Sequence, residues 1–201
     1  MSDLTRKAEP NLLETEQGSE AQIQGAEEFA GQSDHLQRLW TPHRMAYIGG
    51  EARPSDGSAK QCPFCLIPQK SDVEGLVVAR GELAYVVLNL FPYNNGHLMV
   101  CPFEHVATYD QVSADVVAEI GYLTQRAMRA LTLAMSPAGF NIGMNQGDAG
   151  GAGIAAHLHQ HVVPRWSGDA NFFPIIAQTK AMPSLLGQTR DQLATAWEQS
   201  E

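Results

Sequence analysis

Apolar residues along the chain follow the spacings of both strands and helices. Residues 83–90, rich in β-branched and aromatic side chains, predict one strand, and residues 97–102 predict a second. The intervening residues 91–96 combine proline, asparagine and glycine, which suit a tight turn. The pattern therefore predicts an antiparallel hairpin.

Residues 113 to about 136 predict one long helix. Ser113 is a suitable N-cap, Asp115 favours the first turn, and Pro137 with Gly139 ends the helix. The apolar positions recur at helical spacing and form one stripe: Val116, Val117, Ile120, Leu123, Ala127, Met128 and Leu131.

The C-terminal part of the chain predicts two further strands, over residues 140–145 and 156–164. A glycine-rich loop, residues 147–153, joins them. After Trp166 the chain turns, and its end predicts a short helix and a tail. The elements together predict a mixed α+β protein.

Charge divides the chain into two parts. The formal net charge is −9, and residues 1–34 carry −6 of it, with eight acids against two bases. That polar segment predicts a disordered or loosely helical arm, whereas residues 35–201 predict a single domain. The domain has no basic patch, which argues against a polynucleotide partner and leaves room for a small anionic ligand.

Targeting signals are not found in the sequence. No apolar run approaches the roughly 20 residues of a membrane-spanning helix, and the N-terminus lacks the pattern of a signal peptide. We therefore expect a cytoplasmic protein without a membrane partner. The three cysteines, an odd number, argue against a disulfide framework.

Three alternating histidines are the strongest chemical signal. On a strand, His157, His159 and His161 share one face, and the residues between them point to the other. Three buried imidazoles would each need polar partners, so a purely structural row is disfavoured. A surface row and a metal site made of these histidines alone remain alternatives. The alternation beside a glycine loop favours a functional site.

The glycine loop itself is weaker evidence. Residues 147–153 lack bulky side chains, so their backbone N–H groups can approach phosphate oxygens closely. The loop is not a P-loop, because no Gly-Lys-Ser/Thr ending follows. A flexible surface connection would explain the loop equally well, and only its position before the histidines favours a ligand site.

Two cysteines, Cys62 and Cys65, form a Cys-x-x-Cys motif. Alone this motif is half a zinc site. A redox pair is the alternative, although the βαβ pattern that usually surrounds such a pair is missing. Cys101 lies in a predicted strand, where we expect it to be a small buried apolar residue.

Several motifs together resemble the histidine triad family. Residues 157–163, His-Leu-His-Gln-His-Val-Val, resemble the signature His-φ-His-φ-His-φ-φ, where φ is apolar. Residues 94–102 resemble the strand of the family that begins with Gly-His and ends with Pro. Asn145 and the glycine loop add support, and the resemblance covers roughly residues 62–166. It implies an antiparallel sheet with one long helix and short helices packed on it, in a dimer.

The same resemblance implies a nucleotide hydrolase or nucleotidyltransferase. In this family the central histidine, here His159, attacks the α-phosphorus of a nucleoside phosphate, and water or phosphate then accepts the nucleotide. Imidazole suits this role because its unperturbed pKa is about 6.5. His161 and His97 resemble histidines that shape and border the phosphate pocket. Asn89 stands where the family holds the ribose hydroxyls; a residue that only satisfies its own turn is the alternative.

The resemblance also completes the zinc site. In triad relatives that keep the Cys-x-x-Cys motif, the other two ligands resemble His105 and His157. The resulting set of Cys62, Cys65, His105 and His157 would hold a structural Zn²⁺ with four protein ligands. A zinc-dependent hydrolase would need an open metal position, which this set does not leave.

Two departures from the family pattern affect the expected chemistry. Hydrolytic members carry Gln and Ser or Thr before the triad, where this longer loop has Ala152 and Gly153. Backbone amides of Gly151, Ala152 and Gly153 would then stabilise the phosphate, with Asn145 or Gln146 as a side-chain donor. Gln160 also replaces an apolar residue, which predicts that its face is not fully buried.

Three further stretches resemble one branch of the family, the actinobacterial-type diadenosine tetraphosphate phosphorylases. They are residues 36–47, 74–81 and 164–172. The branch implies an adenine nucleotide or dinucleoside polyphosphate as substrate, with phosphorolysis to ATP and ADP favoured over hydrolysis. The alternative from another functional class is a nucleotide-binding regulatory protein with little turnover.

Overall fold

The fold is taken from a computed structural model, which describes residues 57–147, 149–169 and 182–201. The predicted acidic arm, residues 1–34, and the stretch at residues 36–47 lie outside the described residues, as does the end of the stretch at 164–172.

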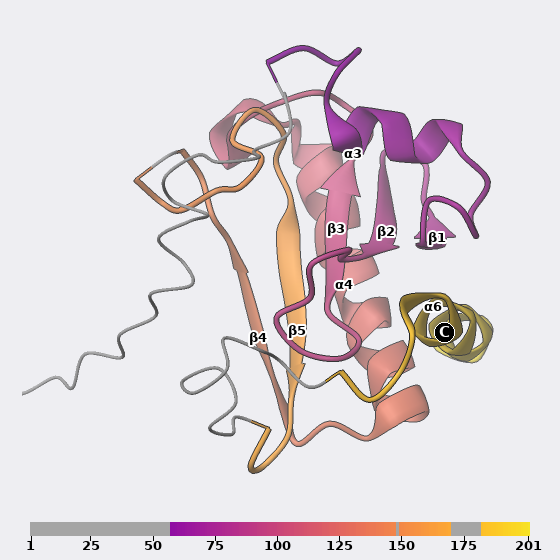
Figure 1. Cartoon of the computed structure of the whole chain (residues 1–201). Helices are drawn as coiled ribbons and strands as arrows, with labels where there is room; N and C mark the ends of the chain where they lie inside the picture. The colour runs from indigo at the N-terminus through magenta and orange to yellow at the C-terminus, as the bar shows by residue number, and fades with distance from the viewer. Residues whose placement is uncertain (1–56, 148, 170–181) are drawn as a thin grey trace, which may run out of the picture. The chain divides into compact units, whose positions relative to one another are not determined.

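A five-stranded antiparallel sheet forms the centre of the fold, in the order β1-β2-β3-β5-β4 (Figure 1). Its strands are β1 (Val77–Arg80), β2 (Ala84–Leu88), β3 (Leu98–Pro102), β4 (Gly139–Met144) and β5 (Gln160–Arg165). The predicted hairpin is confirmed, since β2 pairs with β3 from Ala84 opposite Pro102 to Leu88 opposite Leu98. The strand β1 is an addition to the predicted set.

The predicted long helix is confirmed as α4 (Ala114–Met135). The Ser113 side chain accepts a hydrogen bond from the backbone N–H of Val116, and Ser136 ends the helix in a left-handed conformation. The predicted C-terminal helix is α6 (Leu186–Glu198), and a short helix, α3 (Pro63–Leu66), begins directly after Cys62. The described residues also contain two 3-10 turns, η1 (Ile67–Gln69) and η2 (Tyr109–Gln111).

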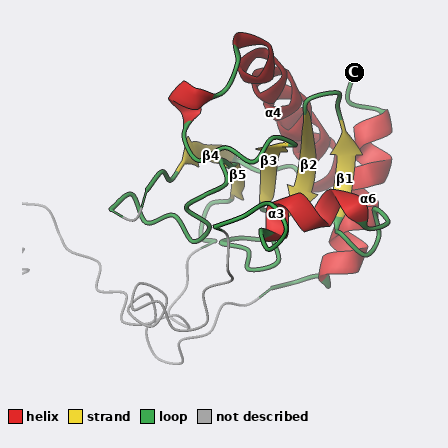
Figure 2. Cartoon of the chain, turned by 90° about the horizontal axis from the view of Figure 1, so that it is seen from above, coloured by secondary structure: helices red, strands yellow, loops and turns green. Residues whose placement is uncertain are grey.

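Helices cover both faces of the sheet. Helix α4 lies on one face, here called the helix face, and α3 lies on the other, the cysteine face (Figure 2). A large apolar core joins the helix face to α4 and α6, and includes Leu98, Val100, Leu131 and Trp197. A smaller core around Tyr85 and Met99 joins the cysteine face to Cys62 and Phe64.

Strand β5 begins later than predicted. His157 and His159 precede the strand, and only His161 lies within it, opposite Met99 of β3. The reason is a contact with a distant part of the chain: the Leu158 backbone N–H donates to the Val106 carbonyl, in the segment beyond β3, and not to a residue of β3. The predicted alternation still holds, because Leu158 and Val162 belong to the core on the helix face.

Gln160 is the exception on the helix face. Its Nε2 donates to the Thr124 hydroxyl of α4 at 2.6 Å, and that hydroxyl donates to the Ile120 carbonyl. The polar residue is thereby accommodated in an otherwise apolar layer. Cys101 is fully buried, as predicted, and burial raises the pKa of its thiol. None of the described helices is long and apolar enough to span a bilayer.

Candidate active site and metal centre

His159 is held so that one ring nitrogen stays available. The residue is 4% exposed, and its Nδ1 lies 2.8 Å from the His157 carbonyl oxygen. Because a carbonyl only accepts, Nδ1 carries the proton and the lone pair of the neutral ring resides on Nε2. The Phe64 ring packs against the imidazole with centroids 4.9 Å apart. The arrangement orients an unprotonated nitrogen, as a nucleophile requires.

A chain of hydrogen bonds fixes the other two imidazoles. The backbone N–H of Tyr93 donates to His97 Nδ1 at 3.0 Å, so the neutral His97 ring carries its proton on Nε2. That Nε2 donates to His161 Nδ1 at 2.9 Å. His161 therefore carries its own proton on Nε2, where it can donate to an anionic ligand.

Burial favours the neutral forms of His159 and His161. Desolvation, together with a smaller effect of the neighbouring His159, lowers the pKa of His161 to about 4. The pKa of His159 is also lowered by burial, against the opposing effect of its hydrogen bond to His157. At neutral pH the site thus offers uncharged imidazoles, which suits one nucleophile and one hydrogen-bond donor.

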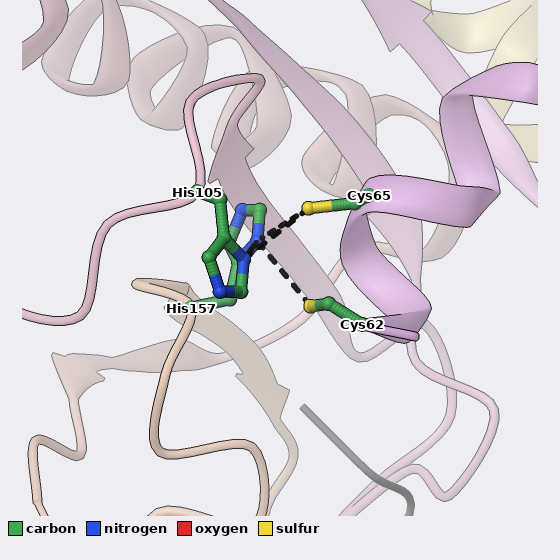
Figure 3. A group of neighbouring side chains, drawn as sticks. All are labelled: Cys62, Cys65, His105 and His157. Carbon is green, nitrogen blue, oxygen red and sulfur yellow. Dashed lines mark hydrogen bonds between the residues drawn. The ribbon is translucent and has the colours of Figure 1, made fainter. Parts of the chain in front are cut away.

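The four predicted metal ligands converge on one point (Figure 3). Cys62 and Cys65 come from the start of α3, and His105 and His157 approach from the loops after β3 and before β5. Cys65 Sγ lies 3.3 Å from His105 Nδ1 and 3.4 Å from His157 Nδ1, and the two Nδ1 atoms are 3.4 Å apart. All four donor atoms lie within 4.8 Å of one another.

This donor set fits a tetrahedral cation. Ligands at about 2.3 Å for sulfur and about 2.0 Å for nitrogen lie roughly 3.3–3.8 Å from each other around Zn²⁺. His157 Nε2 donates to the Pro102 carbonyl at 2.9 Å, which leaves the Nδ1 lone pair facing the cluster. Burial, with the neighbouring Cys62, raises the pKa of Cys65 to about 11. The Cys65 thiol is therefore protonated at neutral pH, and it would lose its proton when a cation binds the sulfur.

His157 links the metal cluster to the nucleophile. Its imidazole faces the two cysteines, and its backbone carbonyl holds the Nδ1–H of His159. A displacement of the His157 ring would therefore also shift the His157 carbonyl, which orients His159. Phe64 strengthens the link, because its ring packs against both imidazoles.

Among the remaining predicted site residues, only Asn89 has a recorded contact with a histidine of the site. The Asn89 side-chain oxygen accepts the Phe91 N–H at 2.9 Å, and its amide lies 3.3 Å from His97 Nδ1. Gln146 Oε1 accepts the Tyr109 N–H at 2.8 Å, so its oxygen is engaged and its amide group remains the donor. Asn145 is partly buried directly after β4.

The glycine loop adopts conformations that require glycine. Gly147 and Gly151 have φ values of 67° and 78°, which disfavour other residues. A Cβ on Gly150 would collide with the Gln146 carbonyl oxygen. Ala152 is buried and Gly153 is partly buried. The loop thus has a defined backbone conformation, which is consistent with the predicted role of its N–H groups in binding phosphate.

Two aromatic residues at the site were not singled out from the sequence. Phe64 packs against His157 and His159, and Tyr93 packs against His97 and His161 with ring centroids 4.7 and 5.5 Å apart. Their positions, between the two cysteines and in the hairpin turn, were the available signals. Neither position alone predicts contact with an imidazole.

Comparison with known proteins agrees with this geometry. The HIT domain family model matches residues 64–168. The AP-4-A phosphorylase of Mycobacterium tuberculosis (strain CDC 1551 / Oshkosh) is 51% identical over 170 residues, which cover 83% of this chain and 87% of that protein. Adenosine 5'-monophosphoramidase of Schizosaccharomyces pombe is 30% identical and covers 52% of this chain and 74% of its own length.

A solved structure shares the fold. A Zn-bound histidine triad family protein from Mycobacterium smegmatis superposes with a TM-score of 0.56 at 25% identity, covering 71% of this chain and 96% of that one. The family match extends over more than half of the chain and contains the histidine row, the hairpin and three of the four clustered metal-ligand candidates. The chain therefore belongs to the HIT domain family.

Proposed function

We propose that the protein cleaves diadenosine tetraphosphate by phosphorolysis, through a nucleotide covalently bound to His159. One observation carries the proposal: His159 donates its Nδ1 proton to the His157 carbonyl, which leaves the Nε2 lone pair for attack. The relative that is 51% identical is named AP-4-A phosphorylase, which supports this substrate and this acceptor.

The reaction divides into two displacements at the α-phosphorus. His159 Nε2 forms a bond to that phosphorus, the bond to the bridging oxygen of the β-phosphate breaks, and ATP leaves. An oxygen of inorganic phosphate then attacks the same phosphorus, the bond to Nε2 breaks, and ADP leaves. Water in place of phosphate would release AMP.

Hydrogen-bond donors would stabilise the charge on the phosphate. His161 presents Nε2–H, and His97 holds it in that tautomer. We assign the ribose to Asn89 and the phosphate oxygens to the backbone of Gly151, Ala152 and Gly153, with Asn145 and Gln146 as amide donors. Since Ala152 and Gly153 lack hydroxyl groups, backbone N–H groups would carry most of this role.

Zn²⁺ is the cation we propose for Cys62, Cys65, His105 and His157. The spacing of the two sulfur and two nitrogen donors supports it, and so does a structural relative described as Zn-bound. The ion would serve a structural role, because four protein ligands complete its tetrahedral shell. In that role the cluster would hold His157, and through its carbonyl, His159.

The proposed function is tested by product analysis. The purified protein is incubated with diadenosine tetraphosphate, with and without inorganic phosphate, and the nucleotides are separated. ATP and ADP that form only with phosphate support phosphorolysis, whereas AMP and ATP would indicate hydrolysis. Binding without turnover would indicate the alternative, a nucleotide-binding regulatory protein.

The pH dependence of the reaction should reflect the buried histidines. Protonated His161 would present an N–H to the N–H of His97. The hydrogen bond between the two rings is therefore intact only while His161 is neutral. Its pKa is lowered to about 4, so neutral His161 persists as the pH falls below 6.5. We expect kcat/KM to keep its plateau below pH 6 and to fall nearer pH 4. A decline centred at pH 6.5, in initial-rate measurements on protein shown to be folded, would contradict this.

A homodimer is the assembly we propose, with β4 at the interface. Among the described strands β4 forms one edge of the sheet, and its residues Asn141, Ile142 and Gly143 are exposed. An open groove of about 580 Å³ lies beside it, lined in part by Leu133 and Phe140. An edge strand with an exposed apolar side chain readily pairs with a second copy.

A charge on this edge should separate the copies. Ile142 is 44% exposed, so Ile142→Glu should fold normally but place a charge in the proposed interface. We expect a dimer mass for the wild type and a monomer mass for Ile142→Glu by analytical ultracentrifugation. Val73→Glu, at a more exposed valine outside the sheet, is the matched control and should remain dimeric. Equal masses for the wild type and Ile142→Glu would refute the interface.

A further inference from the structure

The Tyr85 hydroxyl joins the sheet to the short helix α3. Tyr85 is a fully buried residue of β2, and its hydroxyl donates to the backbone carbonyl of Phe64 at 2.7 Å. The Tyr85 ring is stacked on Phe103, with centroids 5.3 Å apart, and the Cys101 thiol on β3 is a second neighbour of the hydroxyl. Because a carbonyl only accepts, the single hydroxyl proton of Tyr85 points to Phe64.

The sequence explains why the Phe64 carbonyl needs a donor from outside its helix. In a continued helix the N–H four residues on would donate to it, but that residue is Pro68, which has no N–H. The N–H of Ile67, one position nearer, donates to the Pro63 carbonyl instead. A buried carbonyl without a partner is unfavourable, and Tyr85 supplies the donor. The hydrogen bond therefore fixes the backbone of α3 at Phe64.

The side chain of Phe64 transmits this position to the nucleophile. Its ring packs against His159 with centroids 4.9 Å apart and against His157 at 5.5 Å, and the residue is 6% exposed. The hydrogen bond from Nδ1 to the His157 carbonyl holds one edge of the His159 imidazole. Contact with Phe64 limits how that imidazole can tilt about the hydrogen bond. A buried ring in a packed core has little freedom to move unless its backbone moves.

We propose that Tyr85 is a positioning residue for the nucleophile: its hydroxyl fixes the Phe64 backbone, and the Phe64 ring then supports the His159 imidazole. The inference rests on the proposed function and adds to it a residue that acts through Phe64 and not on the substrate. The expected effect is large, because a misplacement of a reacting group by about 1 Å can lower a rate by about 100-fold.

The first test is a kinetic comparison of the wild type with Tyr85→Phe, which keeps the ring and removes only the hydroxyl. Both proteins are assayed at a temperature at which thermal unfolding shows them fully folded. We expect kcat for diadenosine tetraphosphate to fall by at least about tenfold. KM should stay within about threefold, because the change acts on the reacting geometry and not on substrate binding. The zinc content should equal that of the wild type, since all four ligands remain.

A double-mutant cycle tests whether Tyr85 acts through Phe64. In a Phe64→Leu background, the further change Tyr85→Phe should lower kcat by less than about twofold, because the ring that transmits the effect is already absent. Ser200→Ala is the matched control: Ser200 is 2% exposed, and its hydroxyl also donates to a backbone carbonyl, that of Trp197, at 2.8 Å. The control should keep kcat within about twofold of the wild type.

Nuclear magnetic resonance supplies a readout that does not depend on turnover. In protein labelled with ¹³C-histidine, the ring signal of His159 is the one that His159→Asn lacks. A nearby aromatic ring shifts such a signal, so Tyr85→Phe and Phe64→Leu should both move it, whereas Ser200→Ala should leave it in place.

Three results would overturn the inference. They are an unchanged kcat or an unmoved His159 signal in Tyr85→Phe, additive effects of the Tyr85 and Phe64 changes, and a loss of activity that follows a loss of zinc. In the last case Tyr85 would support only the metal cluster. If the wild type fails to turn over diadenosine tetraphosphate but the His159 signal still moves in Tyr85→Phe, the proposed reaction fails and the positioning role stands.

Discussion

His159→Ala should lower kcat for diadenosine tetraphosphate by at least about 10⁴-fold while the protein remains folded. The reason is that removal of Nε2 removes the atom that would form the bond to phosphorus, and loss of a nucleophile has effects of this order. Rates of ATP release measure the effect. A second readout is the covalent intermediate: wild-type protein quenched without phosphate should show the mass of one bound AMP, and His159→Ala should not.

His159→Asn is the matched variant for this prediction. Its side-chain amide can donate to the His157 carbonyl, as Nδ1–H does in the wild type, but it offers no nucleophilic nitrogen. We expect it to be as inactive as His159→Ala and to show a melting temperature closer to that of the wild type. Activity above about 1% in either variant, far more than loss of a nucleophile leaves, would refute the assignment of the nucleophile.

Loss of the metal should impair both stability and catalysis. Cys62→Ser removes one thiolate from the cluster, and we expect the variant to be purified with far less than one zinc per chain. Its melting temperature should fall by about 10 °C or more, since a structural zinc contributes several kcal/mol and each kcal/mol moves Tm by roughly 2–4 °C. Activity should fall as well, because the His157 carbonyl orients His159.

Cys101→Ala controls for the loss of a buried cysteine. Cys101 is fully buried but lies outside the cluster, so this variant should keep its zinc and lose only a small amount of stability. Metal content by mass spectrometry and thermal unfolding distinguish the two variants. Wild-type protein without bound zinc, or Cys62→Ser with undiminished zinc, would contradict the proposed site.

The helix and the hairpin were predictable because their signals are local. The Ser113 cap, the apolar stripe and the terminating Pro137 all lie within one segment, and each acts through neighbours three or four residues away. The hairpin follows likewise from two apolar runs around a turn. Strand β1 was not predicted, because its four residues pair through a bulge and carry little pattern of their own.

The exact start of β5 and the environment of Gln160 could not be predicted. Both depend on residues far away in the chain: Val106 takes the Leu158 N–H, and Thr124 accepts the Gln160 amide. The expectation that the face of Gln160 would be incompletely buried was right only for that residue, which is partly exposed between buried Leu158 and Val162. A polar residue in a core needs a hydrogen-bond partner, and the sequence alone does not identify which residue that is.

By itself the sequence determined that three imidazoles would share one face and that two cysteines would lie three positions apart, since alternation and local spacing are properties of the backbone. Tertiary structure decided how those histidines differ. His157 faces the cysteines, His159 is oriented by the His157 carbonyl, and His161 is paired with His97. Ring orientation and tautomer depend on which group lies opposite each nitrogen, and those groups come from separate strands and loops.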